Sequence, residues 1–175
     1  MTDWQTLENL FHYRSGLTIY PSQARDIEKI LDELLEKASA RSVLLADTSG
    51  ELVASRGELN NNHRATLSSL IASDLAASHE ISHLSGEHDD FQMILREGKF
   101  SHIFITGAGS KLVLYAQIAG KVPLGWARLA LKQAAQLLNE IIQAEPDEKI
   151  EIAINVGREE IANQLGISLD LIWKE

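Results

Sequence analysis

The sequence contains no cysteine, and this absence excludes several kinds of site. A protein without thiols has no disulfide framework, no thiolate metal centre and no cysteine nucleophile. The sequence also has no run of about 18 apolar residues, the length that a transmembrane helix needs. Residues 1–4 (MTDW) lack the basic start and apolar stretch of a secretion signal. We therefore expect a cytoplasmic protein without a membrane partner.

Basic residues are scarce as well. The chain has 16 lysines and arginines against 25 aspartates and glutamates, which gives a formal net charge of -9. Such a chain repels phosphate backbones, and no basic stripe offsets the repulsion, so we expect no nucleic-acid partner. Residues 158–168 resemble the first helix and turn of a helix-turn-helix reader, but too few residues follow for a recognition helix. We interpret this segment as an amphipathic docking helix.

Hydrophobic periodicity predicts one α/β (α+β) domain in a chain of 175 residues. The expected order is helix, two strands, helix, three strands, helix: residues 22–39, 42–47, 51–55, 62–83, 91–95, 100–106, 112–118 and 123–142. Ser22 is the expected N-cap of the first helix, and Gly50 is expected to turn the first hairpin. Antiparallel hairpins predominate, so the economical architecture is a five-stranded antiparallel sheet with helices on its faces. The predicted divisions are an N-terminal arm (1–21), the main domain (22–143) and a C-terminal extension (144–175) with a strand near 150–156 and an amphipathic helix over 158–173.

The helix predicted over residues 62–83 is the most informative element. On a wheel of about 100° per residue, one apolar stripe is expected to face the sheet: Leu67, Ile71 and Leu75, flanked by Leu70 and Ile81. The opposite side carries small residues and one acid: Ser69, Ala72, Ser73, Ala76 and Glu80. Small residues let another backbone approach closely and lower the desolvation cost of an interface. We predict that this side binds a protein partner; helix propensity alone is the alternative explanation for its alanines.

The strand predicted over residues 91–95 is long, apolar and placed at one edge of the sheet. Its apolar side chains include Phe91, Met93 and Leu95. An unprotected edge of this kind tends to pair with another strand. A symmetric dimer through this strand and the small-residue helix face is therefore expected.

A zinc site is the alternative interpretation of the end of the same helix. His79-Glu80-Ile81-Ser82-His83 matches the H-E-x-x-H pattern, in which two histidines bind zinc and the glutamate activates water, and Asp89 is a possible third ligand. The five-residue pattern is short enough to arise by chance, and histidines near a helix C-terminus are favoured by the helix dipole. We prefer the second explanation and assign no metal, no cofactor and no catalytic residue. The glycine-rich stretch 107–110 enters a strand and not a helix, so it is interpreted as a turn and not as a phosphate loop.

Several phrases of the sequence, taken in order, resemble the roadblock domain family. They are residues 42–55 (SVLLADTSGELVAS), the alanine-rich helix, residues 111–117 and residues 123–132 (PLGWARLALK). The resemblance covers residues 22–143 and implies a roadblock/longin-like sheet. Within the family the chain is most similar to the bacterial MglB subgroup. The segments that fit this subgroup are the N-terminal arm, residues 66–67, 84–87 and 123–125, and the extension past residue 146.

The resemblance implies a function as well as a fold. Roadblock proteins form homodimers through the middle helix and the third strand, and the MglB subgroup binds a Ras-like GTPase of the MglA type and raises its GTP hydrolysis without donating an arginine. It implies contacts to the GTPase at Ala72, Ala76 and Glu80, and a role in cell polarity and motility. It also implies a docking role for the C-terminal helix: Ile161, Leu165, Leu169 and Trp173. A roadblock scaffold dimer that binds without stimulating hydrolysis is the remaining alternative.

Overall fold

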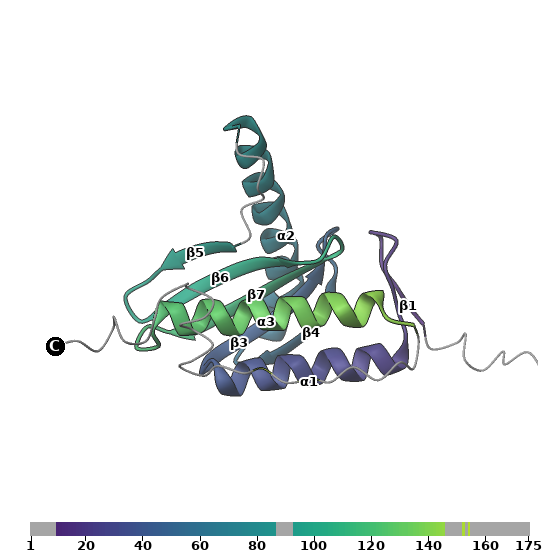
Figure 1. Cartoon of the computed structure of the whole chain (residues 1–175), viewed down its shortest axis with the longest axis horizontal. Helices are drawn as coiled ribbons and strands as arrows, with labels where there is room; N and C mark the ends of the chain where they lie inside the picture. The colour runs from purple at the N-terminus through teal and green to yellow at the C-terminus, as the bar shows by residue number, and fades with distance from the viewer. Residues whose placement is uncertain (1–9, 87–92, 146–151, 153, 155–175) are drawn as a thin grey trace, which may run out of the picture.

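The computed structural model is a three-layer sandwich, in which one antiparallel sheet lies between helices (Figure 1). It describes residues 10–86, 93–145, 152 and 154. The elements, in order, are β1 (Phe11–His12), β2 (Thr18–Ile19), α1 (Pro21–Lys37), β3 (Ala40–Asp47), β4 (Leu52–Gly57), α2 (Asn61–Leu84), β5 (Met93–Glu97), β6 (Ser101–Ala108), β7 (Leu112–Ala119) and α3 (Leu124–Gln143). The predicted fold class and the predicted order of the main elements are confirmed. No helix in the described part of the chain is long and apolar enough to cross a membrane.

The main sheet has the strand order β4-β3-β7-β6-β5, and every neighbouring pair is antiparallel. Strands β3, β7 and β6 are flanked on both sides, which explains their near-continuous apolar sequences. Strand β5 is an edge, as predicted, and β4 is the opposite edge. The two edges therefore carry the backbone groups that remain available for pairing with another chain.

Two apolar cores lie on opposite faces of this sheet. Helices α1 and α3 cover one face, where Leu31 and Leu138 pack with strand residues such as Phe104. Helix α2 covers the other face, where Ile71 and Leu75 pack with Leu44, Ala46, Ile105, Val113 and Tyr115. Alternate residues of each strand point to opposite faces, so one set of strands serves both cores.

Helix α1 begins one residue earlier than the sequence predicts. Pro21 is the first helical residue, a position at which proline loses no hydrogen bond. The Tyr20 backbone N–H donates to Gln23 Oε1 at 3.0 Å, so glutamine in the first turn binds back to the residue before the helix. The expectation that Ser22 caps the helix is therefore wrong, because Ser22 already lies inside the first turn.

The hairpin between β3 and β4 is held by a buried carboxylate. Gly50 has a φ of +88°, as expected for the glycine of this turn. Asp47 is fully buried and accepts hydrogen bonds from the Ser49 hydroxyl (2.7 Å) and from the Glu51 backbone N–H (2.7 Å). Burial alone would raise the pKa of Asp47, but hydrogen bonds from Ser49, Ser15 and Glu51 outweigh it and lower the pKa.

The N-terminal arm contains a small hairpin that the sequence did not predict. Strands β1 and β2 pair antiparallel, with Phe11 opposite Ile19. The hairpin packs on the β3–β4 turn: the Arg14 backbone N–H donates to Glu51 Oε2 at 2.7 Å, and Lys111 Nζ donates to the Ser15 carbonyl at 2.7 Å. The arm is thus attached to the main sheet by polar contacts.

Two described residues of the C-terminal extension form hydrogen bonds with α1: Ala144, whose carbonyl accepts from Gln23 Nε2 (3.4 Å), and Ile154. Ile154 is buried in the α1–α3 core, its backbone N–H donates to Glu33 Oε2 (3.1 Å), and its carbonyl accepts from Lys37 Nζ (2.8 Å). The predicted helix over 158–173, with the proposed docking residues Ile161, Leu165, Leu169 and Trp173, lies outside the described residues.

Candidate functional site: the projecting helix

Helix α2 is longer than the sheet that supports it. Its 24 residues span about 36 Å at 1.5 Å per residue. The first half packs on the sheet, whereas the second half projects past the β5 edge into solvent (Figure 1). The Asn60 side chain caps the helix by accepting from the Asn62 backbone N–H at 3.0 Å, in the way that asparagine favours. On the projecting half, Ile81 and Leu84 are 60% and 76% exposed, so this half has large apolar side chains at its surface.

The buried side of α2 is rotated from the side that the wheel predicts. Ile71 and Leu75 face the sheet as expected, but Ala72, which the wheel places on the outer side, is only 7% exposed, and Ser68 is fully buried. These two small residues let the helix approach the sheet closely. A Cβ atom built on Gly50 would lie 2.8 Å from Ser69 Cα, which measures how tight the approach is. The expected place of Ala72 on the partner surface is therefore wrong.

The same rotation exposes two large apolar residues that were expected to face the sheet. Leu70 and Ile81 are each 60% exposed, and Leu84 is 76% exposed. With the exposed Ala77 they form one stripe, here called the apolar stripe: Leu70, Ala77, Ile81 and Leu84. The stripe spans only about 60° at 100° per residue. Sequence reasoning missed it because it assumed that every large apolar residue of the helix belongs to the core.

Four of the five predicted partner-binding residues do lie at the surface. Ser69, Ser73, Ala76 and Glu80 are all exposed and follow one another at helical spacing; they are here called the small-residue stripe. Ser73 and Ser69 donate their hydroxyl hydrogens to backbone carbonyls one turn earlier, at 2.9 Å and 3.2 Å. Such bonds satisfy the hydroxyls within the helix, so a partner need not replace them with its own polar groups.

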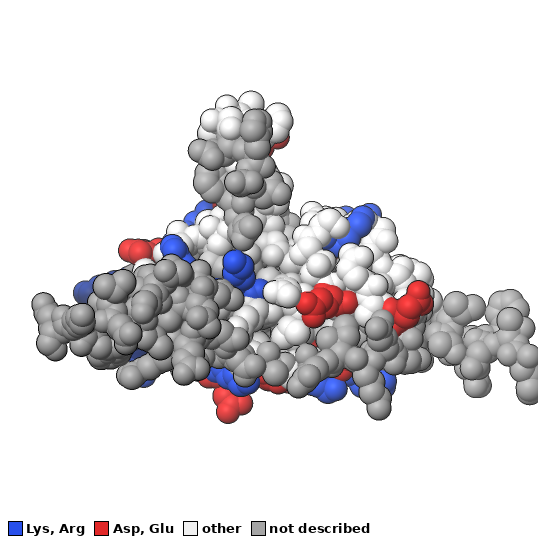
Figure 2. Space-filling model, viewed as in Figure 1, with Lys and Arg blue, Asp and Glu red and all other residues white. Residues whose placement is uncertain are grey.

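The two stripes lie side by side and make one broad face whose only charged member is Glu80. In the space-filling view the described atoms at the top of the projection are mostly white, with red at the right margin, and more red and blue side chains lie below it (Figure 2). Exposed apolar side chains grouped in this way are typical of interaction sites in other proteins.

Strand β5 lies beside the base of the projection. Met93 and Leu95 are partly buried and pack towards the α1–α3 core, while Ile94 packs towards α2. The outer edge of β5 carries no neighbouring strand in the described part of this chain. Phe91, the third residue assigned to the dimer strand, lies outside the described residues.

The histidines of the H-E-x-x-H pattern are exposed near the end of α2. Among the residues that the structure describes, no three His, Cys, Asp or Glu side chains are grouped to hold a metal ion. The third ligand considered, Asp89, is outside those residues. His79 instead lines a cleft between α2, β5 and α3.

Comparisons with known proteins agree with this architecture. Residues 26–117 match the Roadblock/LC7 domain family. Among solved structures, MglB from Myxococcus xanthus is 32% identical over 67% of this chain and 95% of its own, with a TM-score of 0.64. An MglB with a tetrameric arrangement is 29% identical over 71% of this chain and 93% of its own (TM-score 0.65), and the gliding protein MglB from Thermus thermophilus is 27% identical over 71% and 94% (TM-score 0.64). A comparison with curated proteins found no match.

Proposed function

The chain belongs to the Roadblock/LC7 domain family and is most like MglB, and on that premise we propose that it is a cytoplasmic homodimeric regulator of a Ras-like small GTPase of the MglA type. The projecting helix α2 is the single observation that carries the proposal, because it offers two adjacent exposed stripes, with Glu80 as their one charged residue, that have no partner in the described part of the chain. In this account the protein is not an enzyme: it activates GTP hydrolysis by its partner, in a process such as cell polarity or motility.

The two stripes of α2 are suited to different partners. The apolar stripe has large side chains, as the permanent interfaces of homodimers do. We assign it, together with the β5 edge, to contact with a second copy. The small-residue stripe carries hydroxyls, a methyl group and one carboxylate, so it resembles the more polar surfaces of partners that bind and dissociate. We assign it to the GTPase.

The composition of the small-residue stripe bears on how hydrolysis is stimulated. Activators that donate an arginine place its positive charge on the transferring phosphate. Ser69, Ser73, Ala76 and Glu80 include no cation. In our proposal the dimer therefore acts by binding the conformation of the GTPase in which its own catalytic residues are in place.

Substitution of Ala76 tests this assignment. Ala76→Arg puts a long cation on the small-residue stripe, where its exposed position leaves the fold intact. We expect binding of the GTPase and stimulation of single-turnover GTP hydrolysis to be lost, with an unchanged melting temperature and an unchanged dimer. Ala72→Arg is unsuitable for this test, because Ala72 is buried against the sheet.

Two alternatives differ from this proposal in a measurable way. A scaffold dimer would bind the GTPase without changing its single-turnover rate. A zinc peptidase acting through His79, Glu80 and His83 would contain stoichiometric zinc that His79→Ala removes. Metal analysis of the purified protein therefore separates the peptidase from both roadblock functions.

A further inference from the structure

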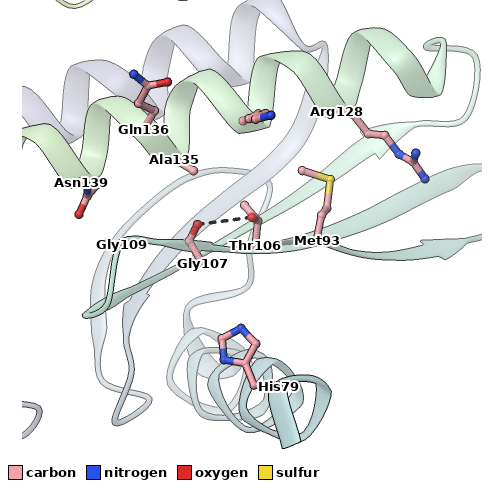
Figure 3. A pocket seen from close by; sticks show the side chains of 10 residues that line it. His79, Met93, Thr106, Gly107, Gly109, Arg128, Ala135, Gln136 and Asn139 are labelled. Carbon is pink, nitrogen blue, oxygen red and sulfur yellow. Dashed lines mark hydrogen bonds between the residues drawn. The ribbon is translucent and has the colours of Figure 1, made fainter. Parts of the chain in front are cut away.

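A cleft of about 540 Å³ opens between the middle of α3, the start of β5 and the projecting half of α2 (Figure 3). Arg128 and Lys132 line it from successive turns of α3, and Met93 and Ala135 contribute apolar walls. Thr106 lies on its floor and His79 points into it from α2 (Figure 3). No carboxylate is among the described residues that line it.

The two cations of this cleft have no counter-charge within the described part of the chain. The ion pairs found there involve other residues, and neither Arg128 nor Lys132 has a hydrogen bond. Two like charges at i and i+4 on a helix repel each other. In a chain with a net charge of -9, two neighbouring cations without an acidic partner among the described residues are able to pair with an acid of another molecule.

The edge strand β5 carries an acid that is equally unpaired. Glu97 is exposed and forms no ion pair with a described residue. Met93 and Leu95 pack on the α3 side of the sheet, and side chains alternate along a strand, so Glu97 faces that side too. The acid and the two cations thus belong to the same face of the sheet.

The geometry of antiparallel pairing decides where Glu97 of a second copy would lie. If a two-fold axis perpendicular to the sheet relates the two copies, both α3 helices lie on the same face of the joined sheet. Residues directly opposite each other in the two β5 strands then point to the same face. Odd-numbered residues of β5 consequently meet odd-numbered ones. The register centred on Leu95 pairs all five residues of β5 and sets Met93 opposite Glu97 of the partner subunit. Opposed Cβ atoms in such a pair are about 4.5–5.5 Å apart.

We infer that a second copy completes the cleft, because this register brings the partner's Glu97 to Met93 at its mouth. There the carboxylate pairs with Arg128 and Lys132, and by symmetry the same contact forms a second time. The inference rests on the proposed homodimer and adds its register. Since charge pairs fix register and reject wrong partners more than they add affinity, the cleft selects β5 of a second copy over other strand edges.

Complementary charge reversals in the full-length protein test this inference. One variant carries Glu97→Lys, and the other carries Arg128→Glu with Lys132→Glu. Each variant alone places like charges at both contacts of its homodimer, whereas a mixture of the two restores opposite charges in the heterodimer. Glu58→Lys and the pair Arg25→Glu with Lys121→Glu change net charge by the same amounts at exposed positions away from the cleft, so they are the matched controls.

Sedimentation measures the dimer, and native mass spectrometry counts the heterodimer. We expect each cleft variant to dimerise on the order of tenfold more weakly than its control. The mixture should form heterodimers well above the half expected from random exchange, and Glu97→Gln should weaken the dimer without this rescue. Unchanged dimerisation of both cleft variants with random exchange would overturn the inference while leaving the homodimer in place. A wild-type protein that stays monomeric would overturn the homodimer as well.

Discussion

The carboxylate of Asp74 on α2 accepts a hydrogen bond from the guanidinium of Arg96 on β5, with 2.9 Å between Oδ1 and Nη2. The bond ties the helix, near the point where it leaves the sheet, to the edge strand. This pair is therefore one contact between the two elements that carry the surfaces we assign to the homodimer, the apolar stripe and the β5 edge.

A double-mutant cycle measures the strength of this tie. The Arg96 side chain is largely exposed, and solvent screens exposed pairs, so we expect a coupling between Asp74→Ala and Arg96→Ala of about 0.2–1 kcal/mol in the free energy of unfolding. Urea denaturation of the two single variants and the double variant gives the value. Strictly additive effects would show that the pair contributes nothing.

The apolar stripe predicts how the dimer can be broken. Leu70→Glu and Ile81→Glu place carboxylates on side chains that are mostly exposed in one chain, so the fold should tolerate them. A charge buried without a partner in a dimer interface is costly, and we expect each variant to be a folded monomer by light scattering. Glu58→Gln, at an exposed position before the start of α2 and outside the apolar stripe, is the control. A dimer as tight as wild type in both variants would remove the apolar stripe from the interface.

Alanine substitutions at two glycines distinguish the stability cost of backbone strain from the cost of close packing. Gly50 and Gly16 both have positive φ, but an added Cβ meets Ser69 Cα at 2.8 Å in the first case and nothing within 4 Å in the second. Gly16→Ala should cost about 1 kcal/mol for the strained backbone alone. Gly50→Ala should cost about 2–4 kcal/mol, since α2 must also move away from the turn. Equal losses in chemical denaturation would mean that the helix is not held against the turn.

The buried carboxylate of Asp47 makes the stability of the fold depend on pH in the acidic range. Its pKa lies below the ordinary value of 3.8, so its hydrogen bonds stabilise the fold fully above that value, and this contribution is lost as the pH falls through the folded-state pKa. Between pH 5 and pH 2 (roughly the window set by a lowered carboxyl pKa), the melting temperature of wild type should fall more steeply than that of Asp47→Asn. Parallel curves for the two proteins would contradict the assigned hydrogen bonds.

Hydrophobic periodicity in the sequence predicted the main secondary-structure elements correctly. It did not predict which side of α2 is buried, because that depends on how closely the helix packs on the sheet. The hairpin at Gly50, the edge position of β5 and the span of α2 all follow from local patterns. The rotation of α2 does not, because a wheel weighs residues by hydrophobicity, whereas Ser68 and Ala72 are buried for their small size. The arm was missed for a different reason: its hairpin is fixed by contacts with Glu51 and Lys111, far away in the sequence.

The central claim is that the small-residue stripe of α2 activates a GTPase. Single-turnover GTP hydrolysis by the cognate Ras-like GTPase, measured with wild type, Ala76→Arg and the exposed control Arg25→Ala, tests it most directly. We predict that wild type and Arg25→Ala accelerate hydrolysis equally, while Ala76→Arg, still a folded dimer, leaves the rate at that of the GTPase alone. Equal acceleration by all three proteins would contradict the claim.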